Sequence, residues 1–284
     1  MSRKHQKKQG TLVDIAILTA GMVDPKIFEE CIHSAQIESA SVPSSTYVLK
    51  NGCPSAYRGL LENYPAKVLT SNENTYFPRG ANKVIRAGTS TLVMFVTDDI
   101  ILHDGTLEKL VRRMDDPTIG LCGLKLIFPE DSSDPGRPAG KVQHIGHGVD
   151  IRGEIVHPLI GWSPEHPKCN VSRDVASVTG GAFIVRRKVF NQVGGFFEGY
   201  GVGYWEDVDL CFGVRELGYR VFIDTEATAT HYVGSSYSKS KIKVPIEQNK
   251  AILRQRKGKL FVHDSWTFWI LSGIIWASYA MQVL

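Results

Sequence analysis

Two acidic clusters stand where carboxylates could do chemistry. The first is Asp98 and Asp99, which directly follow an apolar, β-branched run at Thr91–Val96. In an open α/β sheet, ligands bind outside the carboxyl ends of the strands, so two carboxylates at that position can hold a divalent cation. Hard oxygen ligands of this kind favour Mg2+ or Mn2+. An Asp-Asp pair is equally typical of a loop or a helix N-cap, so both interpretations stay open at this point.

The second acidic cluster, Glu206, Asp207 and Asp209, opens a predicted helix. Acidic residues in a first helical turn are favoured by the helix dipole, which is the structural interpretation. The chemical interpretation is that one carboxylate acts as a general base and removes a proton from a hydroxyl. The preceding segment 199–205 is rich in glycine and aromatic residues, which suits a flexible lid over a ligand.

His231 follows the last predicted strand. A lone histidine is more often structural than a ligand, but its place at a strand end makes it a candidate for the same site. The chain contains no P-loop, no Gly-x-Gly-x-x-Gly fingerprint and no Gly-x-Ser-x-Gly elbow. The common phosphate-binding and serine-hydrolase signatures are therefore excluded as explanations.

The elements that must position these residues alternate through the first half of the chain. Short apolar runs predict strands at 12–18, 46–49, 66–69, 91–96 and 119–127. Helical patterns begin at Pro25, with Asp24 as the N-cap, and cover 78–87 and 104–114. This alternation predicts a largely parallel sheet with helices on both faces.

The second half has a different pattern. Residues 129–138 are rich in Pro, Asp, Ser and Gly and predict a surface loop, and 146–161 predicts a hairpin. A strand is predicted at 175–185, a helix at 186–193 that stops at Gly194, a helix at 207–217 that ends at Gly218, and a last strand at 219–223.

Composition narrows the class of protein. The 284 residues are 43% hydrophobic and 22% charged, which fits one large globular α/β domain. A formal net charge of only +4 gives no general reason to expect nucleic acid as a partner. The five scattered cysteines argue against a disulfide framework and a zinc-thiolate site, and no apolar leader opens the chain. These features predict a cytoplasmic location.

Both ends of the chain leave two interpretations open. Four basic residues crowd positions 1–10, which form either a solvated tail or an arm that touches an anionic surface. Residues 266–284 carry no charge and contain three tryptophans. This tail either contacts a membrane, spanning it or lying in its plane, or packs as a helix on the domain. The first interpretation predicts a peripheral position at the cytoplasmic face of a membrane.

Four segments carry a resemblance to a known family. They are 78–82 (Pro-Arg-Gly-Ala-Asn), 178–196, which contains Thr179-Gly180-Gly181, 204–211 (Tyr-Trp-Glu-Asp-Val-Asp-Leu-Cys) and 218–221. In this order, from about residue 12 to residue 237, the chain resembles the family-two glycosyltransferases of the GT-A fold. Each segment alone is a weak indication of the family, but the four segments in this order are specific to it.

The resemblance implies a single GT-A-type α/β domain with a Rossmann-like, mostly parallel central sheet flanked by helices. Under this interpretation, residues 1–10 are a basic arm and 11–240 are the catalytic domain. Residues 11–127 form its nucleotide-binding half and 128–240 its acceptor-binding half. Residues 241–284 form a C-terminal helical region with an apolar tail.

The resemblance also implies roles in an inverting transfer. Asp99 is the expected metal ligand, assisted by Asp98 and completed by His231, with Mn2+ or Mg2+ as the cofactor. Asp207 is the expected general base, with Glu206 beside it to orient the acceptor. Nucleotide and donor-sugar contacts are implied for Thr19, Ala20, Gly180 and Gly181.

A nucleotide-diphosphate sugar is the implied donor, with a UDP-sugar as the first candidate. The implied acceptor is a hydroxyl of a glycan, a lipid-linked glycan or a protein. The sequence names neither partner more closely, because acceptor choice lies in variable loops.

Two positions depart from the family pattern. Thr97 stands where the family often has the first aspartate of Asp-x-Asp, and Lys50 stands where an aspartate commonly contacts the base. Asn51, the neighbour of Lys50, is expected to take over that contact. These departures motivate the alternative of a catalytically degenerate domain, kept for nucleotide binding or as a membrane-docked assembly subunit. Nucleotidyl transfer is a further rival, but it offers no use for Glu206 and Asp207.

Overall fold

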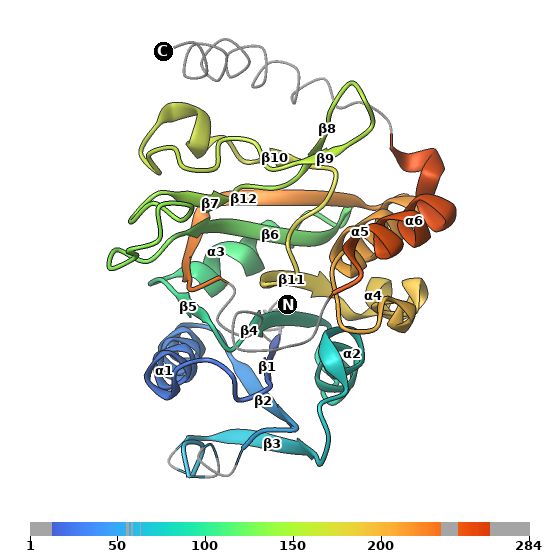
Figure 1. Ribbon diagram of the computed structural model, residues 1–284. Coiled ribbons are helices and arrows are strands. Elements are labelled where there is room, and N and C mark those ends of the chain that lie inside the picture. Colours follow the sequence, from blue (N-terminus) through green and yellow to red (C-terminus); the bar gives the residue numbers. More distant parts are fainter. Residues whose placement is uncertain (1–12, 55–56, 58, 63, 234–243, 262–284) are drawn as a thin grey trace, which may run out of the picture.

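The computed structural model describes residues 13–54, 57, 59–62, 64–233 and 244–261 (Figure 1). The predicted basic arm at 1–10 and the apolar tail at 266–284 lie outside these residues. Within the described part of the chain, no helix combines the length and apolarity needed to cross a bilayer.

A large mixed sheet forms the centre of the molecule, in the order β10-β12-β6-β11-β4-β1-β2-β3. Short strands extend it, with β5 paired to β12 and β7 paired to β6, while β8 and β9 form a separate hairpin. The strands are β1 (Val13–Thr19), β2 (Ser44–Asn51), β3 (Ala66–Ser71), β4 (Leu92–Thr97), β5 (Ile100–Leu102), β6 (Ile119–Ile127), β7 (Val142–His144), β8 (Gly148–Val149), β9 (Ile155–Val156), β10 (Arg173–Asp174), β11 (Ala182–Arg186) and β12 (Arg220–His231).

The sheet is parallel where the sequence pattern alternates. Strands β3, β2, β1 and β4 are all parallel neighbours, and β12 runs parallel to β6. All seven residues of β1 are buried, as expected for a parallel strand covered on both faces. The predicted α/β class with a mainly parallel sheet is therefore confirmed. One antiparallel strand, β11, lies between β4 and β6.

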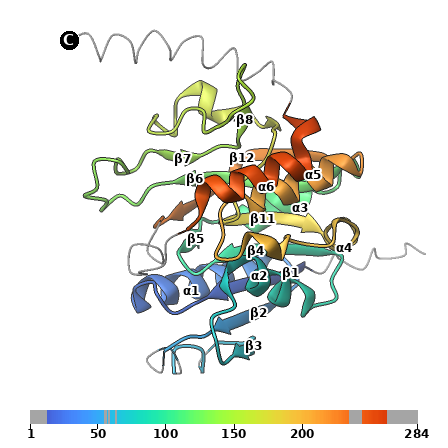
Figure 2. The ribbon, with the colours of Figure 1, turned by 45° about the vertical axis from the view of Figure 1, so that its right-hand side comes forward.

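Helices cover both faces of the sheet (Figures 1 and 2). On one face, α1 and α3 pack on the sheet in one apolar core, and on the other face α2, α4 and α5 pack in a second core. A sixth helix, α6, lies against α5 in a smaller cluster around Phe212 and Leu253. The helices are α1 (Pro25–Ser41), α2 (Tyr76–Arg86), α3 (Thr106–Arg113), α4 (Arg187–Val193), α5 (Glu206–Glu216) and α6 (Ile246–Lys257).

The predicted helix ends follow from local chemistry. The side chain of Asp24 accepts a hydrogen bond from the backbone N–H of Lys26, and Pro25 occupies the first turn of α1. Gly194 ends α4 at φ 92°, a left-handed conformation that glycine adopts without a Cβ clash. These start and stop signals were correctly predicted.

Two strand predictions were wrong in extent. The apolar run 175–185 forms a strand only from Ala182, although Val175 and Val178 are buried in the core beneath α5. An apolar run indicates only that its residues are buried, and here they are buried without forming a continuous β-strand. The last strand extends beyond the predicted 219–223 to His231, passing register shifts near Asp224. Strands of two or three residues, such as β5 and β7, are too short to show a period.

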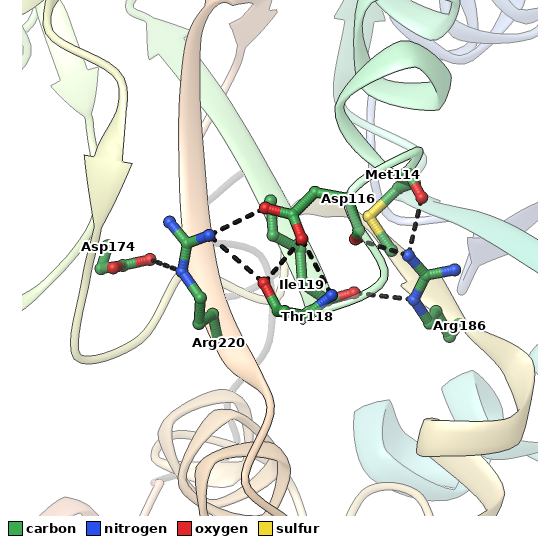
Figure 3. A network of polar contacts seen from close by, with 7 residues as sticks. All are labelled: Met114, Asp116, Thr118, Ile119, Asp174, Arg186 and Arg220. Atoms are coloured by element: carbon green, nitrogen blue, oxygen red, sulfur yellow. Dashed lines mark hydrogen bonds and ion pairs between the residues drawn. The ribbon is translucent and has the colours of Figure 1, made fainter.

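The end of the sheet where β6 and β12 begin and β11 ends is closed by arginines (Figure 3). Arg186 donates to the backbone carbonyls of Met114, Asp116 and Ile119. Arg220 bridges Asp116 and Asp174 at 2.9 and 2.8 Å. Each of these guanidinium groups is satisfied by its neighbours, so this end of the sheet has a structural role.

Candidate active site

A cavity of about 590 Å³ opens at the opposite end of the sheet. Strands β1 and β4 end there, β11 begins there, and β12 ends beside β5. Of the ten site residues predicted from the sequence, nine line this cavity: Ala20, Asn51, Asp98, Asp99, Gly180, Gly181, Glu206, Asp207 and His231. The tenth, Thr19, does not line the cavity, but its hydroxyl donates a hydrogen bond to Asp98, which does. The fold thus gathers residues separated by more than 200 positions, while their roles stay predictions.

Asp98 is buried at the end of β4 and is held by β1. Its Oδ2 accepts a hydrogen bond of 2.6 Å from the Thr19 hydroxyl, which itself accepts from the backbone N–H of Gly21. Burial, and then the neighbouring charge of Asp99, raise the pKa of Asp98 to about 7. A carboxylate whose charge is so poorly solvated gains from a cation placed next to it.

Asp99 lies between β4 and the end of β12. Its Oδ1 accepts a hydrogen bond of 2.7 Å from the Thr97 hydroxyl and lies 3.5 Å from Nε2 of His231. The other ring nitrogen of His231, Nδ1, lies 3.1 Å from Oε1 of Gln143. An imidazole whose far nitrogen is fixed by a polar partner has the arrangement of a metal-ligating histidine. Thr97, which departs from the family pattern, thus orients Asp99.

The carboxylates give the cavity wall a negative charge. Asp98, Asp99, Glu206 and Asp207 all contribute, and no lysine or arginine belongs to the wall within the described residues. A diphosphate would meet only like charge here unless a divalent cation stood between them. Two adjacent carboxylates and an imidazole are a donor set that suits such an ion. The residues present therefore fit a divalent metal.

The acidic pair in the first turn of α5 also lines the cavity. Asp207 accepts hydrogen bonds from the backbone N–H groups of Gly180 at 3.0 Å and of Val208 at 2.8 Å. Burial raises the pKa of Asp207, and these two N–H groups oppose that rise. Glu206 is only 6% exposed, and its Oε2 has no hydrogen-bond partner in the described chain. Burial and the charge of Asp207 raise the pKa of Glu206 well above its usual value.

The two glycines before β11 allow this close packing. A Cβ on Gly181 would lie 3.2 Å from the ring of His231, and one on Gly180 would lie 3.0 Å from Phe77. Both distances are tighter than ordinary contacts, so a side chain at either position would push into the cavity wall. The backbone carbonyl of Gly181 also accepts from the backbone N–H of Thr97 at 2.9 Å.

Asn51 lies in the wall, but its amide is already engaged. Its Oδ1 accepts from the backbone N–H and the hydroxyl of Thr75, and its Nδ2 donates to Asn74 and to the carbonyl of Tyr76. Asn51 therefore fixes the loop that enters α2, and that loop presents Asn74 and Tyr76 to the cavity. Lys50, beside Thr19 in the sheet register, does not line the cavity.

Sequence reasoning missed several residues of the wall. Gln143 belongs to β7, and His147 and His157 lie in the segment 146–161, which the sequence predicted only as a hairpin. The three histidines at 144, 147 and 157 were a visible signal, but nothing in their spacing placed them near Asp207.

The segment before α5 is strained. Tyr204 and Trp205, both in the wall, have φ values of 71° and 79°, a conformation uncommon for non-glycine residues. Helix α6 holds them, because Asn249 donates to the carbonyls of Tyr200 and Gly203, and the indole of Trp205 donates to Ile246. Strain supported in this way is typical of functional sites.

Solved structures with a similar fold include GalNAc-T7 with UDP, GalNAc and Mn2+, which has a TM-score of 0.66 and 12% identity over 87% of this chain and 48% of that one. The mannosyltransferase PcManGT from Pyrobaculum calidifontis, in complex with GDP-Man and Mn2+, has a TM-score of 0.54 and 16% identity over 90% of this chain and 73% of that one. At these identities the likeness shows the fold, which is the GT-A fold predicted above.

Sequence relatives point the same way. The chain is 31% identical over 176 residues to the O-antigen biosynthesis protein RfbC of Myxococcus xanthus, which covers 59% of this chain and 13% of that protein. It is 27% identical over 150 residues to the pre-mycofactocin glycosyltransferase of Mycobacterium tuberculosis, covering 53% of this chain and 28% of the relative. The chain thus matches well under a third of the length of these relatives. The profile of glycosyl transferase family 2 matches residues 44–194, more than half of the chain. The chain therefore belongs to glycosyl transferase family 2.

Proposed function

We propose that this protein transfers a sugar from a nucleotide-diphosphate sugar to an acceptor hydroxyl with inversion at the anomeric carbon. The observation that carries the proposal is that two carboxylate clusters line one cavity, Asp98 and Asp99 at the end of β4 and Glu206 and Asp207 at the start of α5. A leaving diphosphate and an attacking hydroxyl must lie on opposite sides of the transferred sugar, and the two clusters provide one partner for each.

On the donor side, Asp99 and His231 would hold a divalent ion, Mn2+ by preference, with Asp98 beside them. When bound, this ion supplies positive charge for the departing diphosphate. The chain's own part is orientation, because Thr97 fixes the carboxylate of Asp99 and Gln143 fixes the ring of His231. The base of the nucleotide would lie toward Ala20, Asn74 and Tyr76, with UDP as the first candidate. GalNAc-T7 with its UDP and PcManGT with its GDP-Man support a nucleotide donor on this fold.

On the acceptor side, Asp207 would accept the proton of the attacking hydroxyl. The N–H groups of Gly180 and Val208 hold its two oxygens, so the carboxylate does not need to reorganise as the proton arrives. Its pKa is raised by burial, which brings it closer to neutral pH and makes it a stronger base than an exposed aspartate.

Glu206 would play the complementary role. Burial and the charge of Asp207 raise its pKa well above the usual value, which favours the protonated carboxyl, and in that form it can donate a hydrogen bond to an oxygen of the acceptor. In this proposal one of the two neighbouring carboxyl groups acts as the base and the other as the hydrogen-bond donor. The acceptor itself would be a glycan or a lipid-linked glycan.

The first test is thermal stabilisation by a panel of nucleotide sugars, with and without Mn2+. A ligand that binds only the folded protein stabilises it by about 2.7 kcal/mol at a concentration of 100 times Kd. We expect a melting shift for one donor that requires the metal and disappears in Asp99→Ala. Asp104→Ala, which removes an exposed aspartate five positions later, is the matched control and should keep the shift.

The absence of a shift for every donor would favour the catalytically degenerate domain instead. With the donor known, the anomeric configuration of the product decides the mechanism. A product with the donor's configuration retained would exclude a single displacement with Asp207 as the base.

A further inference from the structure

Three histidines face one another beside the cavity, and two of them, His147 and His157, line it. His144 ends β7, His147 follows it, and His157 follows β9 in the hairpin. One ring nitrogen from each lies within 4.8 Å of the others, and the ring centroids are 4.3 to 5.7 Å apart. His144 and His147 are 2% and 3% exposed, while His157 is exposed at the surface.

The closest approach is between Nε2 of His147 and Nε2 of His157, at 3.1 Å. The other nitrogen of His147, Nδ1, lies 2.8 Å from the Ser177 hydroxyl. If Nδ1 donates its proton to that hydroxyl, Nε2 presents a lone pair, as in a histidine that binds a metal and is fixed from behind. Zinc–nitrogen bonds of about 2.0–2.1 Å in a tetrahedral site put two ligand nitrogens roughly 3.3 Å apart. The observed pair is within a few tenths of an ångström of that spacing.

His144 adds an unsatisfied group. Its Nε2 accepts a hydrogen bond of 3.1 Å from the backbone N–H of Thr179, and its Nδ1 is buried with no partner in the described chain. Buried polar atoms are nearly always paired, so an orphaned ring nitrogen in a histidine cluster indicates a missing partner. Ligation through Nδ1 would shift the ring proton to Nε2 and exchange the bond from Thr179 for a metal–nitrogen bond.

We propose that His144, His147 and His157 form a second metal site, distinct from Asp99 and His231, which binds a transition-metal ion of the Zn2+ type. Three imidazoles and no carboxylate favour Zn2+ over the Mn2+ or Mg2+ expected at the acidic pair. Burial lowers the pKa of the His144 and His147 rings, which favours the neutral form that binds metal.

The site would tie the hairpin to the sheet. His144 and His147 belong to the sheet side, and His157 follows Ile155 and Val156 of β9. His147, Ile155 and His157 all line the cavity, so an ion here would fix part of the wall of the cavity that Glu206 and Asp207 also line. Three protein ligands leave a fourth position for water or for an oxygen of a ligand in the cavity.

The test is Zn2+ binding by calorimetry to full-length protein without a histidine tag, stripped with a chelator. The background is Asp99→Ala, in which the acidic site is disabled. We expect one equivalent of Zn2+ to bind and to raise the melting temperature. His157→Ala should reduce the affinity at least tenfold, and His144→Ala should do the same. His33→Ala removes an exposed histidine of α1 and is the matched control, with no expected effect.

Because His157 is exposed, its alanine variant should fold, and urea unfolding of the metal-free proteins checks this. Co2+ in place of Zn2+ gives a second readout, since tetrahedral imidazole ligation produces visible absorption that His157→Ala should remove. Absence of Zn2+ binding to Asp99→Ala would overturn the proposal, as would unchanged affinity in His157→Ala. The ring pair would then be an ordinary hydrogen bond. Neither measurement depends on transferase activity, so this proposal and the proposed function can fail separately.

Discussion

At the scale of single residues, the two carboxyl groups at the start of α5 differ in what holds them. Asp207 receives two backbone hydrogen bonds, whereas Oε2 of Glu206 receives none from the described chain. Backbone N–H groups stabilise the charged form of a carboxylate, and burial without them stabilises the neutral form. The same helical turn therefore contains one group suited to accept a proton and one suited to donate a hydrogen bond.

Asp207→Asn should lower the rate of transfer by about 10² to 10⁴, the usual contribution of a general base. Asparagine has a single side-chain oxygen, so one of the two backbone N–H groups also loses its acceptor, at about 1–3 kcal/mol of stability. The donor-induced melting shift should survive, which separates a lost base from a lost fold. Glu216→Gln, an exposed position of the same helix, should leave the rate unchanged. A near-normal rate of transfer in the Asp207→Asn variant would mean that another residue acts as the base.

The raised pKa of Glu206 predicts that the stability of the protein depends on pH. Its pKa is raised in the folded protein above the usual 4.5, so between these values the unfolded chain ionises while the folded protein keeps its proton. The unfolded state then binds fewer protons, and the free energy of unfolding falls as pH rises from about 4.5 toward the folded pKa. Below 4.5 both states are protonated and the group contributes no such loss.

Glu206→Gln removes this titration while it keeps a neutral side chain of similar size. We expect the variant to gain stability relative to the wild type as pH rises from 4 to 8, measured by urea unfolding of the metal-free proteins at each pH. Equal differences in unfolding free energy at both pH values would show that Glu206 titrates normally.

At the scale of elements, α6 supports the segment that carries the strained Tyr204 and Trp205. The link is Asn249, which is 2% exposed and donates to two backbone carbonyls of that segment. A second link is the ion pair between Arg256 and Asp209, whose other partner is the hydroxyl of Tyr200. A helix outside the sheet thus sets the backbone of the cavity wall just before α5.

Asn249→Ala should release this segment. Each buried carbonyl that loses its donor costs about 1–3 kcal/mol, so we expect measurable destabilisation in urea unfolding. Hydrogen exchange should accelerate at residues 200–205, and the KM for the acceptor should rise. Gln248→Ala, its exposed neighbour, is the control and should change none of these. Unchanged exchange at 200–205 would mean that the segment keeps its shape without α6.

At the scale of the whole molecule, the contribution of an ion pair to stability depends on how deeply the pair is buried. Arg187 at the start of α4 contacts Asp14 of β1 at 2.6 Å, with side chains 13% and 3% exposed. Asp14 also accepts two hydrogen bonds from Ser90. This pair joins parts of the chain 173 residues apart. By contrast, Arg220 and its two aspartate partners are 39% to 59% exposed.

Arg187→Ala should therefore destabilise the protein by about 3–5 kcal/mol, because it leaves the charge of Asp14 buried without its partner. Arg220→Ala should cost much less, because exposed ion pairs contribute little to stability. Chemical unfolding of the two variants side by side tests this order. A larger loss for Arg220→Ala would mean that the network in Figure 3 is more tightly coupled than its exposure indicates.

The sequence by itself determined the alternation of strands and helices, the start of α1, the end of α4, and nine of the residues that line the cavity. It could do so because strand and helix periods, N-caps and glycine stops are local properties that a few neighbouring residues set. The Asp98–Asp99 and Glu206–Asp207 pairs were visible for the same reason, since each is contiguous in the chain.

Only the tertiary structure decided how these pieces meet. The insertion of β11 beside β4 brings Gly181 to His231, and β7 brings Gln143 to the same ring. The raised pKa of Asp98 depends on burial by residues from other strands, which no local pattern encodes. The histidine cluster has the same origin, because a hairpin folds His157 back onto His147. Contacts between distant segments are set by packing of the whole sheet, and that is why the sequence could not place them.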